Sequence, residues 1–122
     1  MTTSIPCAFC EIIEGRSPAT VIDSWDDAFA IVPLNPVVNG HLLIIPFTHV
    51  PDFTTDPAVS AATMHRAAEL AAGMDSYNLI TSKGKPATQS VFHLHLHLIP
   101  RAENDGLALP WYSGRQRLAT TK

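Results

Sequence analysis

The sequence predicts one α+β domain, built on an antiparallel β-sheet with one long and one short helix. Five strand-like segments are joined by turns and do not alternate with helices, which favours antiparallel pairing. A single long stretch is rich in helix-forming residues. The length of 122 residues suits one domain, 1–122, with an irregular C-terminal tail expected from about residue 107.

The first predicted element is a short helix over residues 7–15. Phe9, Ile12 and Ile13 follow the i, i+3, i+4 spacing of one helical face. Gly15 suits the position just after a helix, where a left-handed backbone is common. We therefore expect this helix to bury one apolar face and to stop near Gly15.

Three strands follow in the first half of the chain. Residues 19–24 and 28–32 are β-branched or apolar, and two aspartates between them suit a turn. Residues 41–47 form a continuous apolar run, which indicates burial on both faces of a sheet. Proline, asparagine and glycine residues before this run mark a longer turn region.

The long helix is predicted over residues 57–74, a stretch rich in alanine. Asp56 is a suitable N-cap, and Pro57 suits the first helical position. Strands are predicted over residues 76–82 and 89–100. The second of these alternates apolar and polar residues with a period of two, which is the clearest strand pattern in the chain.

The composition limits the classes of partner. Charged residues are 16% of the chain, against roughly 25% in an average soluble domain, and the net charge is -3. This charge balance argues against a nucleic-acid partner, because a dedicated nucleic-acid binder usually shows a basic patch. The low charge fits a surface partly covered by a partner chain. No apolar run reaches the roughly 18–20 residues of a membrane span and no signal peptide is visible, so we expect a cytoplasmic protein with no membrane partner.

Three histidines share one face of the last predicted strand. His93, His95 and His97 alternate with leucines, and residues i, i+2 and i+4 of a strand point to the same side. The leucines would pack in the core, while three titratable rings would gather on the opposite face. From the spacing alone, a zinc site and metal-free histidine catalysis both stay open.

Two cysteines lie three positions apart near the N-terminus. Cys7 and Cys10 form a Cys-x-x-Cys pair, which supplies half of a tetrahedral zinc site. In a reducing compartment such a pair is more often a metal or redox site than a structural disulfide. No thioredoxin-like pattern surrounds the pair, so a metal site is favoured over redox chemistry, and two free buried thiols are the third alternative.

Four blocks of sequence resemble the histidine triad (HIT) superfamily of nucleotide hydrolases and transferases. The letters HLHLHL over residues 93–98 match the family pattern of three histidines alternating with apolar residues, preceded here by QSVF and followed by IPR. The letters CAFCEII over residues 7–13 resemble the family's N-terminal segment. The pair Asn35-Pro36 and the letters GHLLIIP over residues 40–46 resemble its central strand. The chain is most similar to the small Hint-like bacterial members.

This resemblance implies a fold and an activity. Family members have a five-stranded antiparallel sheet with two helices, and they pair through the long helix and a strand into a homodimer. They bind a nucleoside monophosphate group joined to a leaving group. The resemblance therefore implies a hydrolase of nucleoside phosphoramidates or other nucleotidyl conjugates. Its substrate would be a small molecule of the purine-nucleotide type, and its intermediate a nucleotidyl-histidine.

The resemblance also implies roles for single residues. His95, the middle histidine, corresponds to the nucleophile, and His97 to a donor that stabilises phosphate charge. Eight residues match family positions that contact the phosphate, the base or the ribose of the substrate: Ser82, Gln89, Ser90, Phe9, Ile12, Ile31, Leu34 and Asn35. The family often has asparagine where this chain has Ser82, and an acidic residue where it has Pro33. The proline side chain offers no acceptor to the ribose hydroxyls, so Asn35 is the candidate to bind them in place of the acidic residue.

A structural zinc is implied in the same way. Members with the N-terminal cysteine pair complete the site with the histidine after the central strand and the first triad histidine. The ligand set implied for this chain has four members: Cys7, Cys10, His49 and His93. This assignment leaves the other two triad histidines for catalysis, and no organic cofactor is expected.

Other functions are compatible with these residues. A dinucleoside polyphosphate hydrolase would use the same triad with a different leaving group. A nucleotide-binding module with vestigial catalysis is suggested by the changes at Pro33 and Ser82. A zinc hydrolase that uses all three triad histidines at a metal is a further alternative. Two histidines receive no catalytic role: we expect His65 on a helix surface and His41 in a structural position.

Overall fold

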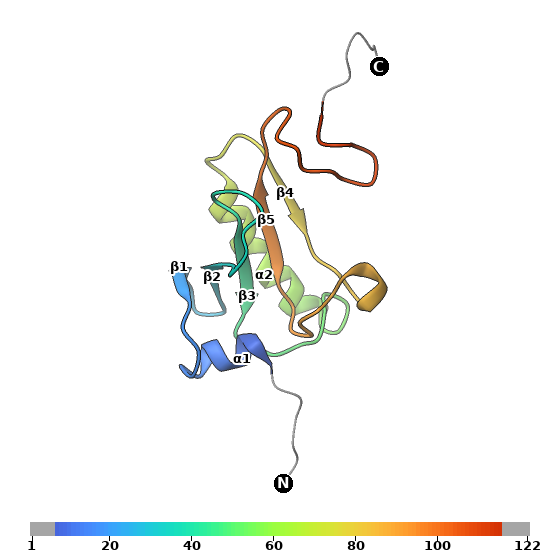
Figure 1. The fold of residues 1–122 in the computed structure, drawn as a ribbon. Helices are drawn as coiled ribbons and strands as arrows, with labels where there is room; N and C mark the ends of the chain where they lie inside the picture. The colour runs from blue at the N-terminus through green and yellow to red at the C-terminus, as the bar shows by residue number, and fades with distance from the viewer. Residues whose placement is uncertain (1–6, 116–122) are drawn as a thin grey trace.

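A five-stranded antiparallel sheet forms the centre of the protein, with the strand order β1-β2-β3-β5-β4 (Figure 1). The computed structural model describes residues 7–115. The strands are β1 Thr20–Ser24, β2 Ala28–Val32, β3 Leu42–Pro46, β4 Tyr77–Ile80 and β5 Leu96–Pro100. The helices are α1 Ala8–Ile13 and α2 Pro57–Ala71, and a short 3₁₀ turn covers Lys85–Ala87. The predicted α+β class is confirmed, with one long and one short helix.

α2 begins where the sequence predicts, α1 begins one residue later than predicted, and both helices end earlier. The Asp56 carboxylate accepts hydrogen bonds from the first backbone N–H groups of α2, and Pro57 stands at the first position. α2 ends at Ala71, three residues before the predicted end, because the next turn tightens into i→i−3 bonds such as Met74 N–H to the Ala71 carbonyl at 3.0 Å. α1 likewise stops at Ile13, shortly before Gly15.

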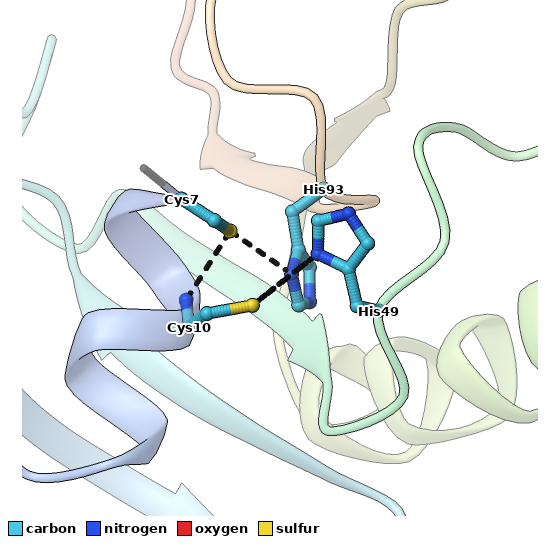
Figure 2. Close-up of side chains that lie close together, drawn as sticks. All are labelled: Cys7, Cys10, His49 and His93. Atoms are coloured by element: carbon cyan, nitrogen blue, oxygen red, sulfur yellow. Dashed lines mark hydrogen bonds between the residues drawn. The ribbon is translucent and has the colours of Figure 1, made fainter. Parts of the chain in front are cut away.

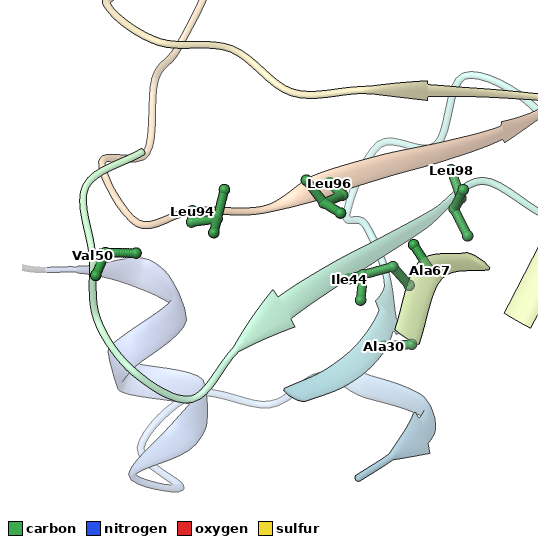
Figure 3. Packing of buried hydrophobic residues seen from close by; sticks show 7 residues of the cluster. All are labelled: Ala30, Ile44, Val50, Ala67, Leu94, Leu96 and Leu98. Carbon is green, nitrogen blue, oxygen red and sulfur yellow. The ribbon is translucent and has the colours of Figure 1, made fainter. Parts of the chain in front are cut away.

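The two faces of the sheet carry separate apolar clusters. α2 covers one face, and Figure 1 shows it running behind the strands. Figure 3 shows the cluster between α2 and the sheet, made of Ala30, Ile44, Val50, Ala67, Leu94, Leu96 and Leu98. The other cluster includes the α1 side chain of Phe9, together with Phe29, Ile31, Leu43 and Ile45. β3 is thus buried on both faces, as its continuous apolar run predicts.

The strand register aligns a row of side chains across the sheet. Ile31 of β2 pairs with Leu43 of β3, Leu43 pairs with His97 of β5, and His97 pairs with Ile80 of β4. Directly paired residues point to the same face. The last triad histidine therefore continues the apolar row that starts on the α1 side of the sheet.

The predicted strand over residues 89–100 is wrong for its first seven residues, because β5 begins only at Leu96. β4 ends at Ile80, opposite His97, and the pairing of β3 with β5 stops at Ile44 and Leu96, although β3 itself continues to Pro46. The backbone before β5 takes other partners instead, such as the carbonyl of Val50, which accepts from Leu94 N–H at 2.8 Å. The side chains still alternate between the two faces.

The segment after β5 is irregular and is held by one arginine. Arg101 forms an ion pair with Asp105 at 2.8 Å and donates to the side chain of Asn78 on β4. Its guanidinium also lies 5.8 Å from the ring centre of Tyr112. Trp111 by contrast is 80% exposed. The part of the predicted tail beyond residue 115 lies outside the described residues. Within residues 7–115, no helix is long and apolar enough to cross a membrane.

Candidate active site and metal centre

The three triad histidines lie on the sheet face opposite to α2. The leucines between them are all buried against α2, at 1% to 4% exposure. This packing fixes which way the chain segment faces, so the rings of His93, His95 and His97 project toward α1. There Phe9 of α1 packs edge-on against two of them, with ring centres 5.8 Å from His93 and 4.9 Å from His95.

The ring of His95 is held in one tautomer by a backbone group. Its Nδ1 lies 2.8 Å from the carbonyl oxygen of His93. A carbonyl can only accept, so Nδ1 carries the proton and Nε2 carries a free lone pair. Burial lowers the pKa of His95, so the ring is neutral near pH 7. A neutral imidazole with an unprotonated Nε2 is able to attack an electrophile.

The ring of His97 is oriented by a residue to which sequence reasoning gave no catalytic role. His41 is 4% exposed, and its Nδ1 accepts from the Val37 N–H at 3.1 Å. The His41 proton therefore sits on Nε2, which donates to His97 Nδ1 at 3.0 Å. The proton of His97 is left on Nε2, where it can be donated to a bound oxygen. Burial first, and then His95 and His41, lowers the pKa of His97 to about 4.

A weak signal for His41 existed in the sequence. In the sequence, His41 directly precedes the most apolar strand and follows Gly40. In the structure, the φ of Gly40 is +92°. A Cβ at that glycine would lie 3.1 Å from the Pro100 side chain, so the chain passes close to the end of β5 here. A polar residue buried next to such a close crossing needs a partner, and that partner is His97.

The four predicted metal ligands converge on one point (Figure 2). Cys7 and Cys10 come from the start of α1, His49 from the loop after β3, and His93 from the segment before β5. Their ligand atoms all lie within 4.8 Å of one another. His93 Nδ1 is 3.4 Å from Cys7 Sγ and 3.6 Å from Cys10 Sγ, and His49 Nδ1 is 3.2 Å from Cys10 Sγ.

These separations fit a tetrahedral zinc ion. Zn–S bonds of about 2.3 Å and Zn–N bonds of about 2.05 Å give S–N edges of about 3.6 Å and N–N edges of about 3.3 Å. The observed S–N distances are 3.2 to 3.6 Å, and the two Nδ1 atoms are 3.0 Å apart. His93 Nε2 donates to the Pro46 carbonyl at 2.9 Å, which leaves Nδ1 free as a ligand.

The metal ligands are held by local structure. Cys7 is the N-cap of α1, and its sulfur accepts from the Cys10 N–H at 3.3 Å. Burial, and then the neighbouring Cys7, raises the pKa of the Cys10 thiol to about 11. The thiol must lose its proton when a metal binds, so binding would be stronger at higher pH. The residues can therefore hold a metal ion, and two thiolates with two imidazoles favour zinc.

The sequence itself matches a family model. The model described as the HIT domain covers residues 14–104. The chain belongs to the HIT family. The predicted resemblance is thereby confirmed, and all three triad histidines lie within the matched residues.

Named relatives and solved structures of HIT proteins extend the comparison. The chain is 42% identical over 108 residues to the adenylylsulfatase HINT3 of Arabidopsis thaliana, covering 83% of this chain but 55% of that relative. It is 36% identical over 118 residues to the adenosine 5'-monophosphoramidase HNT1 of Saccharomyces cerevisiae, covering 90% and 72% of the two chains. A zinc-bound HIT protein from Mycobacterium smegmatis superimposes with a TM-score of 0.74 at 34% identity, covering 90% and 82%.

The predicted base-pocket residues of this HIT domain divide into two groups. Phe9 and Ile31 are buried in the cluster on the triad face, and Ile12 packs against it. Leu34 is 96% exposed in the loop after β2, and Asn35 beside it is also exposed. The structure therefore places Phe9, Ile12 and Ile31 on the sheet face that carries the triad, and Leu34 and Asn35 in an exposed loop. The contacts of all five with a nucleotide stay predictions.

The predicted phosphate contacts lie in two segments next to the triad. Ser82 follows β4 and is half-buried, and Ser90 is exposed in the loop before His93. Gln89 is buried at 5% exposure, and its amide is engaged by the backbone. It accepts from Gly84 N–H at 2.8 Å and donates to the Pro51 carbonyl at 2.7 Å. Gln89 thus supports the loop that carries Ser90, and its contact with substrate stays a prediction.

Proposed function

We propose that the protein hydrolyses nucleoside phosphoramidates or related nucleotidyl conjugates at the α-phosphate. The observation that carries the proposal is the fixed tautomer of His95, whose Nδ1–H donates to the His93 carbonyl at 2.8 Å. This bond leaves Nε2 unprotonated on the face of the sheet that also holds Phe9 and Ile31. A nucleophile beside these buried apolar side chains suits a phosphate ester that carries a flat base.

The proposed reaction has two displacements at phosphorus. In the first, His95 Nε2 forms a bond to the α-phosphorus, and the bond to the leaving group breaks with its electron pair on that group, which takes up a proton from solvent. In the second, water attacks the phosphorus and gives up one proton to solvent, the bond to Nε2 breaks with its electron pair on His95, and the nucleoside monophosphate is released. His97 donates its Nε2–H to a phosphate oxygen and stabilises the charge in both transition states. Each displacement inverts phosphorus, so the configuration is retained overall.

The named relatives support this substrate class. One acts on an adenylyl sulfate and another on an adenosine phosphoramidate, as their names state. We propose the same class for this chain and a purine base in the pocket formed by Phe9, Ile12 and Ile31.

The test compares the nucleophile with a matched surface histidine. His95→Ala should lower the turnover of adenosine 5'-phosphoramidate by at least about 1000-fold, because covalent catalysis needs Nε2. Its affinity for AMP, measured by calorimetry, should change little. His65→Ala is the control, because His65 lies exposed on α2 and pairs with Glu69. Full activity in His95→Ala would refute the mechanism. AMP binding by the wild type without turnover would favour a nucleotide-binding module instead.

We also propose that the four converging side chains hold a structural zinc ion. The four ligand atoms fit a tetrahedral site with all four positions filled, which is the arrangement of a structural rather than a catalytic zinc. The ion would join α1 to the loop after β3 and to the segment before β5. Since α1 carries Phe9, the clip would keep the wall of the base pocket against His95.

Pairing of two copies through α2 and β4 is a further part of the proposal. β4 is an edge strand of the sheet, and its residues Leu79 and Ile80 are each 37% exposed. Met64 on α2 is 49% exposed. An edge strand with unpaired backbone groups and apolar side chains suits a second strand of the same kind. The low charge of the chain supports the same homodimer.

A further inference from the structure

The nucleophilic histidine lies just beyond the hydrogen-bonded part of the sheet. The pairing of β4 with β5 ends at Ile80 and His97. The pairing of β3 with β5 ends at Ile44 and Leu96. His95 therefore receives no strand ladder on either side. Its position depends on bonds made by the segments that continue from the ends of β3 and β4.

The last residue of β3 and the loop after it hold the segment on one side. The Leu94 N–H donates to the carbonyl of Val50 at 2.8 Å, and His93 Nε2 donates to the carbonyl of Pro46 at 2.9 Å. These bonds reach the two residues before the nucleophile. They leave the carbonyl of His95 itself to the other side.

The continuation of β4 reaches His95 through a side chain. The hydroxyl of Thr81, the residue directly after β4, donates to the carbonyl oxygen of His95 at 2.8 Å. A side-chain oxygen takes the place of the backbone N–H that a longer strand would supply. The half-buried hydroxyl thus ties the nucleophile's own peptide to the edge of the sheet.

We propose that Thr81 is a positioning residue for the His95 nucleophile. The inference rests on the proposed function for its effect on turnover. The bond acts at the carbonyl of His95, two residues away from the His93 carbonyl that fixes the ring tautomer. Without it, the His95 peptide is held from the β3 side alone and moves more. Displacement of a reacting atom by about 1 Å can cost about 100-fold in rate, so a partial loosening is expected to cost about 10-fold.

Two variants separate the hydroxyl from the shape of the side chain. Thr81→Val keeps the β-branched shape and the strand preference but removes the donor. Thr81→Ser keeps the donor and removes a methyl group. Thr81→Val should lower kcat for adenosine 5'-phosphoramidate about 10-fold, with KM and the AMP affinity changed less than about 2-fold. Thr81→Ser should restore kcat to within about 3-fold of wild type. If activity were lost through impaired folding, the loss would depend on the side-chain methyl group. Thr81→Ser, which lacks that group, would then not restore kcat.

An NMR measurement tests the role of Thr81 without any turnover. In ¹⁵N-labelled wild type, the His95 ring should show one tautomer with the proton on Nδ1. In Thr81→Val the same signals should broaden or show a second tautomer, and in Thr81→Ser they should match wild type. If wild type turns over no substrate, the proposed function fails while this comparison still decides the role of Thr81. Unchanged His95 signals in Thr81→Val would overturn the proposal, and so would an unchanged kcat in an active wild type.

Discussion

Replacement of His41 tests whether the tautomer of His97 depends on the hydrogen bond that His41 donates to it. In wild type, Val37 N–H donates to His41 Nδ1, and His41 Nε2–H donates to His97 Nδ1 at 3.0 Å. In wild type the ring centres of His41 and His97 lie 5.3 Å apart. His41→Phe keeps an aromatic ring at this position. The variant removes the donor, so His97 can move its proton to Nδ1 and present a lone pair to the phosphate.

The size of the effect follows from burial. His41 is 4% exposed, so water is poorly placed to replace the lost donor. An unsatisfied buried polar group costs about 1–3 kcal/mol. Each 1.36 kcal/mol corresponds to a factor of ten in rate, so kcat/KM should fall by about 5- to 150-fold. The Val37 N–H also loses its acceptor, so the melting temperature should fall as well.

The assay is steady-state turnover of adenosine 5'-phosphoramidate at a temperature where circular dichroism shows the variant folded. His41→Gln is the informative companion, because its amide N–H can still donate to His97 Nδ1 and should recover part of the activity. His65→Phe serves as the control on an exposed helix position. If folded His41→Phe keeps wild-type kcat/KM, the hydrogen bond from His41 to His97 has no role in catalysis and the tautomer assigned to His97 is wrong.

Two further outcomes follow from the metal site and from burial. Cys10→Ser should weaken zinc binding by at least about 100-fold, measured by metal analysis after dialysis against a chelator, and should lower the melting temperature. Equal zinc content in this variant and in wild type would exclude Cys10 as a ligand. The pKa of His97 is about 4 in the folded protein and 6.5 in the unfolded chain, so the unfolded chain binds more protons between these values. Stability should therefore fall as pH is lowered from about 6.5 to about 4, by up to about 3 kcal/mol, and His97→Asn should flatten this dependence. A denaturant midpoint that stays constant over this range in wild type would contradict the assignment.

Most of the fold was predictable from local patterns. β2 was predicted residue for residue over 28–32, and the N-cap and first position of α2 were identified from Asp56 and Pro57. The sheet was also assigned correctly as antiparallel with five strands. These features depend on side-chain periodicity and on capping chemistry, both of which act within a few residues of the chain.

The last strand shows where local pattern was insufficient. Residues 89–95 alternate as a strand should, yet they carry no ladder, because a strand exists only where a neighbour is present to pair with it. The alternation still predicted which side chains face the core. The period of two therefore predicted the face to which each side chain points, while the extent of pairing with β3 and β4 set where β5 begins.

By itself, the sequence determined the chemical groups of this protein. Residue type and spacing indicated the triad and the cysteine pair, and the resemblance to the HIT family added His49 and His93 as the other two members of the metal cluster. Only the tertiary structure decided the tautomers of His95 and His97, the part played by His41 and the support from Thr81. Each of these depends on one hydrogen bond between chain segments or on the local path of the backbone. Such bonds require positions accurate to a few tenths of an ångström, and packing of the whole sheet sets those positions.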